Sequence, residues 1–129
     1  MRLTDDQRML RDTVAPFLAE EGGPAKQLRH WRDTGCKDGF GHALWKQFAE
    51  LGLTGMLIPE ADGGAGLGQV EAGLVLEEVG RNLTPSPFLT TAVTAVRALE
   101  GSAAAERWFP GILAGETVAA LAIDEGPHH

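Results

Sequence analysis

Apolar residues recur every three or four positions along most of this chain, and this spacing constrains its fold more than any other feature. Across residues 3–23 the spacing places one apolar stripe on a helix, which is typical of a helix that buries a single face. The stripe consists of Leu10, Val14, Phe17 and Leu18. Thr4 and Gln7 form a capping-box pattern that predicts the start of this helix, and Gly22 predicts its end.

The same spacing predicts four more helices joined by short loops. They cover residues 38–52, 69–82, 86–101 and 102–115. Residues 24–39 are less regular, and we expect a loop there with at most a short helical piece. Ser86 followed by Pro87 is a strong helix start, whereas Pro110 is expected to bend or shorten the last helix.

Periodicity also predicts which side chains face the core. In the second and third helices they are Leu44, Phe48, Leu51, Val70, Leu74 and Val79. In the fourth helix they are Phe88, Ala92, Val96 and Leu99. Trp45 and Trp108 fall on apolar helix faces, and we expect both in the core rather than stacked on a cofactor.

The stretch at residues 116–124 is apolar and β-branched at one end, which predicts a strand. A single strand has no hydrogen-bond ladder to join, so we expect the other strands of its sheet to lie outside this sequence. The sequence therefore predicts an all-α fold. It is an up-and-down bundle of four to five helices that ends in the first strand of a following β-domain.

Length and composition exclude several classes of protein. A chain of 129 residues is expected to form one domain, and its net charge of −7 offers no basic surface for nucleic acid. Cys36 is the only cysteine, which excludes an internal disulfide and fits a reducing compartment. The start of the chain lacks the apolar core of a secretory signal, and no apolar run approaches the roughly 20 residues that span a membrane. We expect a cytoplasmic protein with no membrane contact.

Residues 59–68, PEADGGAGLG, form a glycine loop in which Gly63 and Gly68 have the spacing of a phosphate-binding loop. Gln69 and Val70 stand where that motif requires lysine and a hydroxyl residue, so the phosphate and magnesium contacts are missing. The dinucleotide-binding pattern fails as well. The loop is interpreted as a structural turn that needs positive φ at several glycines.

No complete catalytic constellation is present in the sequence. Adjacent carboxylates at Glu77 and Glu78 do not face each other on a helix, and Glu77 with Arg81 predicts a surface ion pair instead. Potential metal ligands gather at the end of the chain, at Asp124, Glu125, His128 and His129. Neighbouring histidines rarely chelate one ion without further ligands, so we expect no metal site.

Five stretches together resemble the amino-terminal domain of the acyl-CoA dehydrogenase family, in the same order and at the same spacings. They read LTDDQRMLRDTV, LWKQFAELGLTGMLIPEADGGAGLG, LVLEEVGRNL, GSAAAERWFPGILAGE and AALAIDE. None is diagnostic alone, but the combination is specific and covers essentially the whole chain. The glycine loop is a marker of the family rather than part of its chemistry.

The resemblance implies the first, all-helical domain of a flavoenzyme that continues with a β-domain and a second helical bundle. Residues 1–116 would form the helical domain, and residues 117–129 the start of the β-domain. Family members use FAD to oxidise the α,β bond of an acyl-CoA thioester. A glutamate base removes the α proton while the β hydride passes to N5 of the flavin. That glutamate belongs to later parts of the fold, so this segment alone is expected to be inactive.

The resemblance also implies two sets of site residues. Those along the flavin are Leu121, Ile123 and Asp124. Those at the floor of the acyl pocket are Pro87, Phe88 and Thr91, where a small and apolar lining would suit an apolar acyl chain. The family strand usually ends in Thr-Glu-Pro, whereas this chain has Asp124, Glu125 and Gly126. It therefore departs from the family at the usual hydroxyl contact with the flavin.

The implied partners are an acyl-CoA substrate, an electron-transfer flavoprotein or similar acceptor, and further copies or a second subunit in a homo- or hetero-oligomer. The stretch NLTPSPFLTT resembles actinobacterial-type members. Some of these act on bulky or steroid-derived thioesters and pair a catalytic subunit with one that lacks the base. The alternative function is therefore a non-catalytic partner subunit of a heteromeric acyl-CoA dehydrogenase. A generic helical binding domain without flavin is the third hypothesis.

Overall fold

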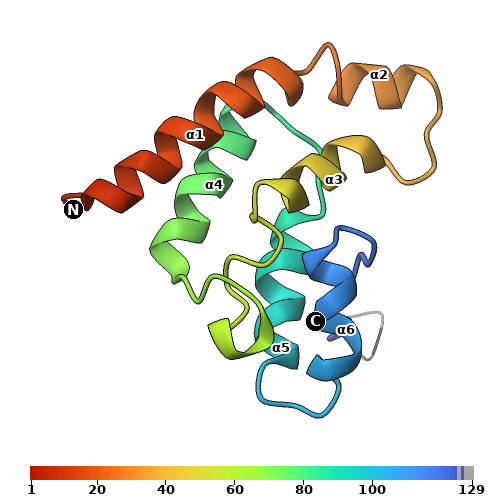
Figure 1. The fold of residues 1–129 in the computed structure, drawn as a ribbon. Helices are drawn as coiled ribbons and strands as arrows, with labels where there is room; N and C mark the ends of the chain where they lie inside the picture. The colour runs from red at the N-terminus through yellow and green to blue at the C-terminus, as the bar shows by residue number, and fades with distance from the viewer. Residues whose placement is uncertain (125, 127–129) are drawn as a thin grey trace.

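Helices account for all the regular secondary structure in the computed structural model, which describes residues 1–124 and 126 (Figure 1). The α-helices are α1 (Asp5–Glu21), α2 (Leu28–Asp33), α3 (His42–Glu50), α4 (Gln69–Arg81), α5 (Val96–Leu99) and α6 (Ala105–Leu113). A 3₁₀-helix, η1 (Glu60–Asp62), and a π-helix, η2 (Phe88–Ala95), complete the set. The all-α class is confirmed over these residues. They hold six α-helices rather than four to five, and the additional one, α2, is the short helical piece expected within residues 24–39.

The capping box predicted at the start of α1 is present. Thr4 Oγ1 accepts the N–H of Gln7 at 3.2 Å, and Gln7 Oε1 accepts the N–H of Thr4 at 3.0 Å. The helix continues through Pro16 and is capped by Gly22, as predicted. None of the helices in residues 1–124 is long and apolar enough to cross a membrane.

Gln7 also connects α1 to α4, which lies beside it (Figure 1). Its Nε2 donates to Oε1 of Glu71 at 2.9 Å, across 64 positions of sequence. The second carboxylate oxygen of Glu71 accepts the N–H of Gly68 at 3.0 Å and so caps α4. One amide therefore joins the caps of two helices. These donors, with Gln7 contributing most, lower the pKa of Glu71.

We expect Gln7→Leu to raise the pKa of Glu71 toward its usual range, because the strongest donor to the carboxylate is lost. The rise should be partial, since the N–H of Gly68 remains. A lowered pKa contributes stability that is present above the usual glutamate pKa and is lost as pH falls through the pKa of the folded state. The stability of Gln7→Leu should therefore fall less steeply than that of the wild type as the pH is lowered.

An NMR titration of the Glu71 carboxyl group measures this shift directly. Thr4→Ala is the matched control, because it removes the other half of the α1 cap while leaving Gln7 bonded to Glu71. Its Glu71 pKa should stay at the wild-type value. An unchanged pKa in Gln7→Leu would contradict the contact between the two helices.

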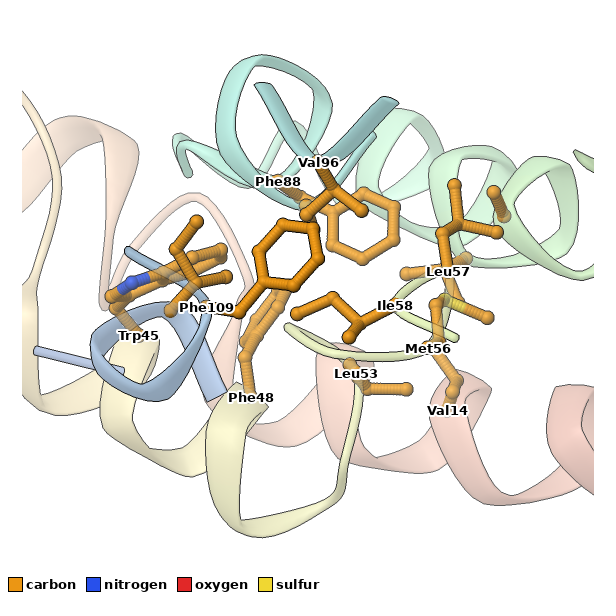
Figure 2. Close-up of a cluster of buried hydrophobic side chains, with 14 of the residues drawn as sticks. Val14, Trp45, Phe48, Leu53, Met56, Leu57, Ile58, Phe88, Val96 and Phe109 are labelled. Atoms are coloured by element: carbon orange, nitrogen blue, oxygen red, sulfur yellow. The ribbon is translucent and has the colours of Figure 1, made fainter. Parts of the chain in front are cut away.

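Phenyl rings from three helices meet at the centre of the core, from Phe48 of α3, Phe88 of η2 and Phe109 of α6 (Figure 2). The ring centroids of Phe48 and Phe88 lie 6.1 Å apart. Other large side chains of this cluster are Val14, Leu18, Trp45, Leu53, Met56, Leu57, Ile58, Val96 and Ile112. Residues 53–58 are all buried although they form no helix, so the connection from α3 to the glycine loop is itself part of the core.

Two side chains predicted to face inward, Leu51 and Val70, are exposed. α3 ends at Glu50, and Leu51 is its C-cap, so the helical period no longer directs that side chain toward the core. In α4, Leu74 is buried and Val79 packs against the core, as predicted. Ala72, Val75 and Glu78 are buried on this helix as well. In the fourth predicted helix the inward positions are confirmed. Phe88, Ala92 and Val96 are buried, and Leu99 packs against the core.

The fourth predicted helix begins one residue later than expected. Pro87 occupies the cap position, and Ser86 Oγ accepts the N–H of Phe88 at 3.4 Å. The helix opens as η2, in which the N–H of Val96 bonds back to the carbonyl of Thr91, and continues as α5. α6 is shorter than predicted and ends at Leu113, three residues after Pro110.

Residues 116–124 form no helix and pair with no other described segment as a strand, so the strand remains a prediction. Side-chain exposure nevertheless alternates along this segment. Thr117 and Ala119 are half-buried, whereas Val118 and Ala120 are exposed. This period of two is that of an extended chain with one face against the helices.

Candidate functional site

The glycine loop has its amide groups occupied by the protein itself. The N–H groups of residues 63–67 all donate to backbone carbonyls, at 2.8–3.1 Å. The acceptors are Gly55, Met56, Ile58, Pro59 and Glu60. A phosphate site would need several of these donors unpaired. Gly63 and Gly66 have φ of 91° and 63°, the left-handed conformation predicted for the turn, so the structural interpretation is confirmed.

Glu77 and Glu78 do not form a carboxylate pair, because Arg81 binds both. Its Nη2 lies 3.0 Å from Glu77 Oε1, and its Nε lies 3.2 Å from Glu78 Oε1. Glu78 is buried, whereas Glu77 and Arg81 are exposed. The predicted Glu77–Arg81 surface ion pair is confirmed, and Glu78 extends it toward the core.

Within residues 1–124 and 126, no three potential metal ligands come together. Three of the four ligands considered from the sequence, Glu125, His128 and His129, lie outside the described residues. No observation on the described residues therefore favours a metal centre.

The three residues implied to line the acyl pocket are all buried within the domain. Pro87 caps η2, and Phe88 is 0% exposed with its ring against Phe48. Thr91 is likewise fully buried. Exposed side chains on the same helix belong to Leu89 and Thr90 instead. The role of Pro87, Phe88 and Thr91 in binding an acyl chain stays a prediction.

Thr91 contacts the segment that follows α6. Its hydroxyl donates to the carbonyl of Ala119 at 2.7 Å and accepts the N–H of the same residue at 3.0 Å. A second attachment lies just before it, where the carbonyl of Gly111 accepts the N–H groups of Glu116 and Thr117 at 2.9 and 3.0 Å. The segment is therefore held against both η2 and α6.

A cavity of about 270 Å³ opens between this segment and the helices. The residues that line it are Ala95, Ala98, Leu99, Trp108, Thr117, Val118, Ala119, Ala120 and Leu121. Trp108 was predicted to lie in the core, but it is 40% exposed and forms a wall of this cavity. The guanidinium of Arg107 lies 4.8 Å from the centre of its ring. Periodicity alone does not reveal such a half-exposed tryptophan, because its exposure depends on how the segment after α6 folds back beside it.

The residues implied to lie along the flavin extend from this segment. Leu121 is 50% exposed and Ile123 is 73% exposed, and Asp124 is exposed as well. Two large apolar side chains thus stand at the domain surface beyond the attachment at Ala119. Glu125, the next residue in the family pattern, lies outside the described residues.

Comparisons with known proteins agree on one family. A family model described as "Acyl-CoA dehydrogenase, N-terminal domain" matches residues 4–116. The chain is 33% identical over 122 residues to acyl-CoA dehydrogenase IpdE2 of Mycobacterium tuberculosis, covering 93% of this chain and 37% of that protein. It is 37% identical over 133 residues to benzylmalonyl-CoA dehydrogenase of Aromatoleum aromaticum, covering 95% of this chain and 33% of the relative.

A solved structure has the same fold. It is described as the steroid ACAD Tcur3481-Tcur3483, in a variant form, and matches with a TM-score of 0.75 at 30% identity. The match covers 86% of this chain and 30% of that one. The chain spans about a third of the length of the curated relatives that it matches.

Proposed function

The chain is the N-terminal domain of a member of the acyl-CoA dehydrogenase family, and we propose that the complete protein is a flavoenzyme that oxidises the α,β bond of an acyl-CoA thioester. The observation that carries the proposal is the family match over residues 4–116. It spans every helix and stops where the extended segment begins. This supports a helical domain at residues 1–116 and a following domain that starts with residues 117–129.

The extended segment suits one side of a flavin site. Leu121 and Ile123 present apolar side chains at the surface, which fit the face of a flat aromatic ring system. Asp124 fits less well, because its carboxylate adds negative charge where family members have a threonine hydroxyl. FAD, when bound, accepts the hydride from the substrate. The part proposed for this domain is to hold Leu121 and Ile123 against the ring and to keep water from that side.

The acyl chain is proposed to lie against the start of η2. Pro87, Phe88 and Thr91 fix that helix from within, since all three side chains are buried in the domain. Their contribution to the pocket floor is to hold the shape of the helix under the acyl chain. The relatives named above carry acyl-CoA substrates in their names, which supports a thioester of this class.

Further elements of the proposal come from the family alone. The electron acceptor would be an electron-transfer flavoprotein or a similar protein, and the enzyme would act in the cytoplasm as a homo- or hetero-oligomer. The catalytic base would be supplied outside this segment, which is expected to be inactive alone.

Asp124 favours a second candidate function, a non-catalytic partner subunit in a heteromeric enzyme. A subunit that does not perform the chemistry can tolerate a carboxylate where the family usually places a threonine beside the flavin. The steroid ACAD with the matching fold carries two designations in its name, which fits an assembly of two proteins.

Flavin content tests the proposal. The complete protein that carries this domain, purified without added cofactor, is expected to show the visible absorption of oxidised flavin and to release FAD on denaturation. A colourless protein that takes up no FAD on reconstitution would contradict the proposal and favour a helical binding domain without flavin.

A further inference from the structure

Thr91 uses its hydroxyl in a way that differs from its neighbour on the same helix. The hydroxyl of Thr90 donates to the carbonyl of Pro87 at 3.2 Å, a local bond within the helix. The hydroxyl of Thr91 instead reaches across 28 positions of sequence and both donates to and accepts from Ala119. Serine and threonine in helices commonly bond to the preceding turn, so the long-range pairing of Thr91 requires a structural reason.

The pairing replaces the contact that a neighbouring strand would make. In a sheet, a residue satisfies its N–H and its carbonyl on an adjacent strand. Both the N–H and the carbonyl of Ala119 bond to the one hydroxyl of Thr91, because a hydroxyl can donate one hydrogen bond and accept another at the same time. Thr91 is fully buried, so its hydroxyl has no contact with water to replace these two bonds. The attachment therefore fixes Ala119 in position and in register.

Fixing Ala119 also fixes the side chains that follow it. In an extended segment, residues two and four positions apart share one face, so we expect Leu121 and Ile123 to follow the face of Ala119. Leu121 lines the cavity beside the helices, and both side chains are largely exposed. The carbonyl of Gly111 holds Thr117 two positions earlier, at 3.0 Å. A shift of one residue at Ala119 would turn both apolar side chains to the opposite face.

We propose that Thr91 is a positioning residue whose hydroxyl sets the register of residues 117–123 and thereby places Leu121 and Ile123 against the flavin. The placement against the flavin rests on the proposed function, whereas the attachment of Ala119 does not. Thr91 thus acts on the cofactor side through the backbone of the extended segment, in addition to the pocket role implied by the resemblance.

The test compares three variants of the complete protein. Thr91→Val keeps the shape of the side chain and removes the hydroxyl, Thr91→Ser keeps the hydroxyl, and Thr90→Val removes the neighbouring hydroxyl that bonds only locally. Amide hydrogen exchange of Ala119 reports the attachment. We expect it to accelerate about tenfold in Thr91→Val, the effect of losing one buried hydrogen bond. It should stay near the wild-type rate in Thr91→Ser and Thr90→Val.

The visible circular dichroism of the bound flavin and its reduction potential report how Leu121 and Ile123 lie against the flavin. Both should change in Thr91→Val and return toward wild type in Thr91→Ser. Should Thr91→Val not fold, Ala119→Pro removes the N–H from the other side of the contact, and the same change in the flavin signals is expected.

Three results would overturn the inference. An unchanged exchange rate of Ala119 in Thr91→Val would show that the Thr91 hydroxyl does not hold this residue. Faster exchange with unchanged flavin signals would show that Thr91 holds Ala119 but does not affect the cofactor. A wild-type protein without flavin would overturn the proposed function and the placement together, while the exchange rates still decide whether Thr91 holds Ala119.

Discussion

Phe88→Ala is expected to lower the free energy of unfolding by about 4 kcal/mol. The Phe88 side chain is 0% exposed, and its ring lies 6.1 Å from that of Phe48 at the centre of the core (Figure 2). Removing the ring loses its burial and leaves a cavity between η2 and α3, which the rigid surroundings can fill only in part. Urea denaturation followed by far-ultraviolet circular dichroism measures the loss.

Leu89→Ala is the matched control, one position further along η2. Leu89 is 52% exposed, so its truncation should change stability by no more than about 0.5 kcal/mol. The pair also tests the pocket role implied for Phe88. A Phe88→Ala variant of unchanged stability with an altered preference for acyl chain length would place the ring in the acyl pocket rather than in the core.

Gly64→Ala is expected to lower stability by about 3 kcal/mol, because the glycine loop packs tightly against the segment that precedes it. A Cβ at Gly64 would lie 2.5 Å from Ile58 Cβ and 2.6 Å from the Ile58 carbonyl carbon. Ile58 is fully buried, so its backbone cannot move aside without disturbing the core. The bonds from the loop N–H groups to residues 55–60 should weaken with it.

Gly73→Ala provides a control of opposite sign. A Cβ at Gly73 meets nothing within 4 Å, and the residue lies inside α4. Alanine there should raise stability by about 0.8 kcal/mol through its helix propensity. Thermal denaturation of both variants measures the difference. A Gly64→Ala protein as stable as wild type would show that the loop does not pack on Ile58 as described.

Local signals explain which parts of the fold could be predicted. The start of α1 is encoded within four residues, by Thr4 and Gln7, and the capping box forms as expected. Val14 and Leu18 are buried because the helix is long enough for its period to hold. The prediction that Leu51 faces the core was wrong for the converse reason, because α3 ends before that residue. Periodicity predicts the interior of a helix better than its ends.

The contacts that position the site are not local, and the sequence shows no pattern for them. Thr91 meets Ala119 across 28 positions, and Gln7 meets Glu71 across 64. Trp108 is half-exposed because its surroundings depend on a segment that folds back over α6. Such pairings depend on the tertiary arrangement, which no spacing rule supplies.

The residues proposed for cofactor and substrate could be named only through the resemblance to the family. Leu121, Ile123 and Asp124 carry no functional motif of their own, and Pro87 belongs only to a helix-start signal. The structure locates them on the extended segment and at the start of η2. The family match supports the family assignment, while their roles remain predictions.

Anaerobic titration of the complete flavin-loaded protein with a panel of acyl-CoA thioesters, from short to bulky chains, tests the central claim most directly. We predict that at least one thioester bleaches the visible flavin absorption, as expected when the α,β bond is oxidised and the hydride passes to FAD. Flavin that stays oxidised with every thioester would contradict a catalytic role and favour the partner subunit. In that case bleaching should appear only when a second subunit is added.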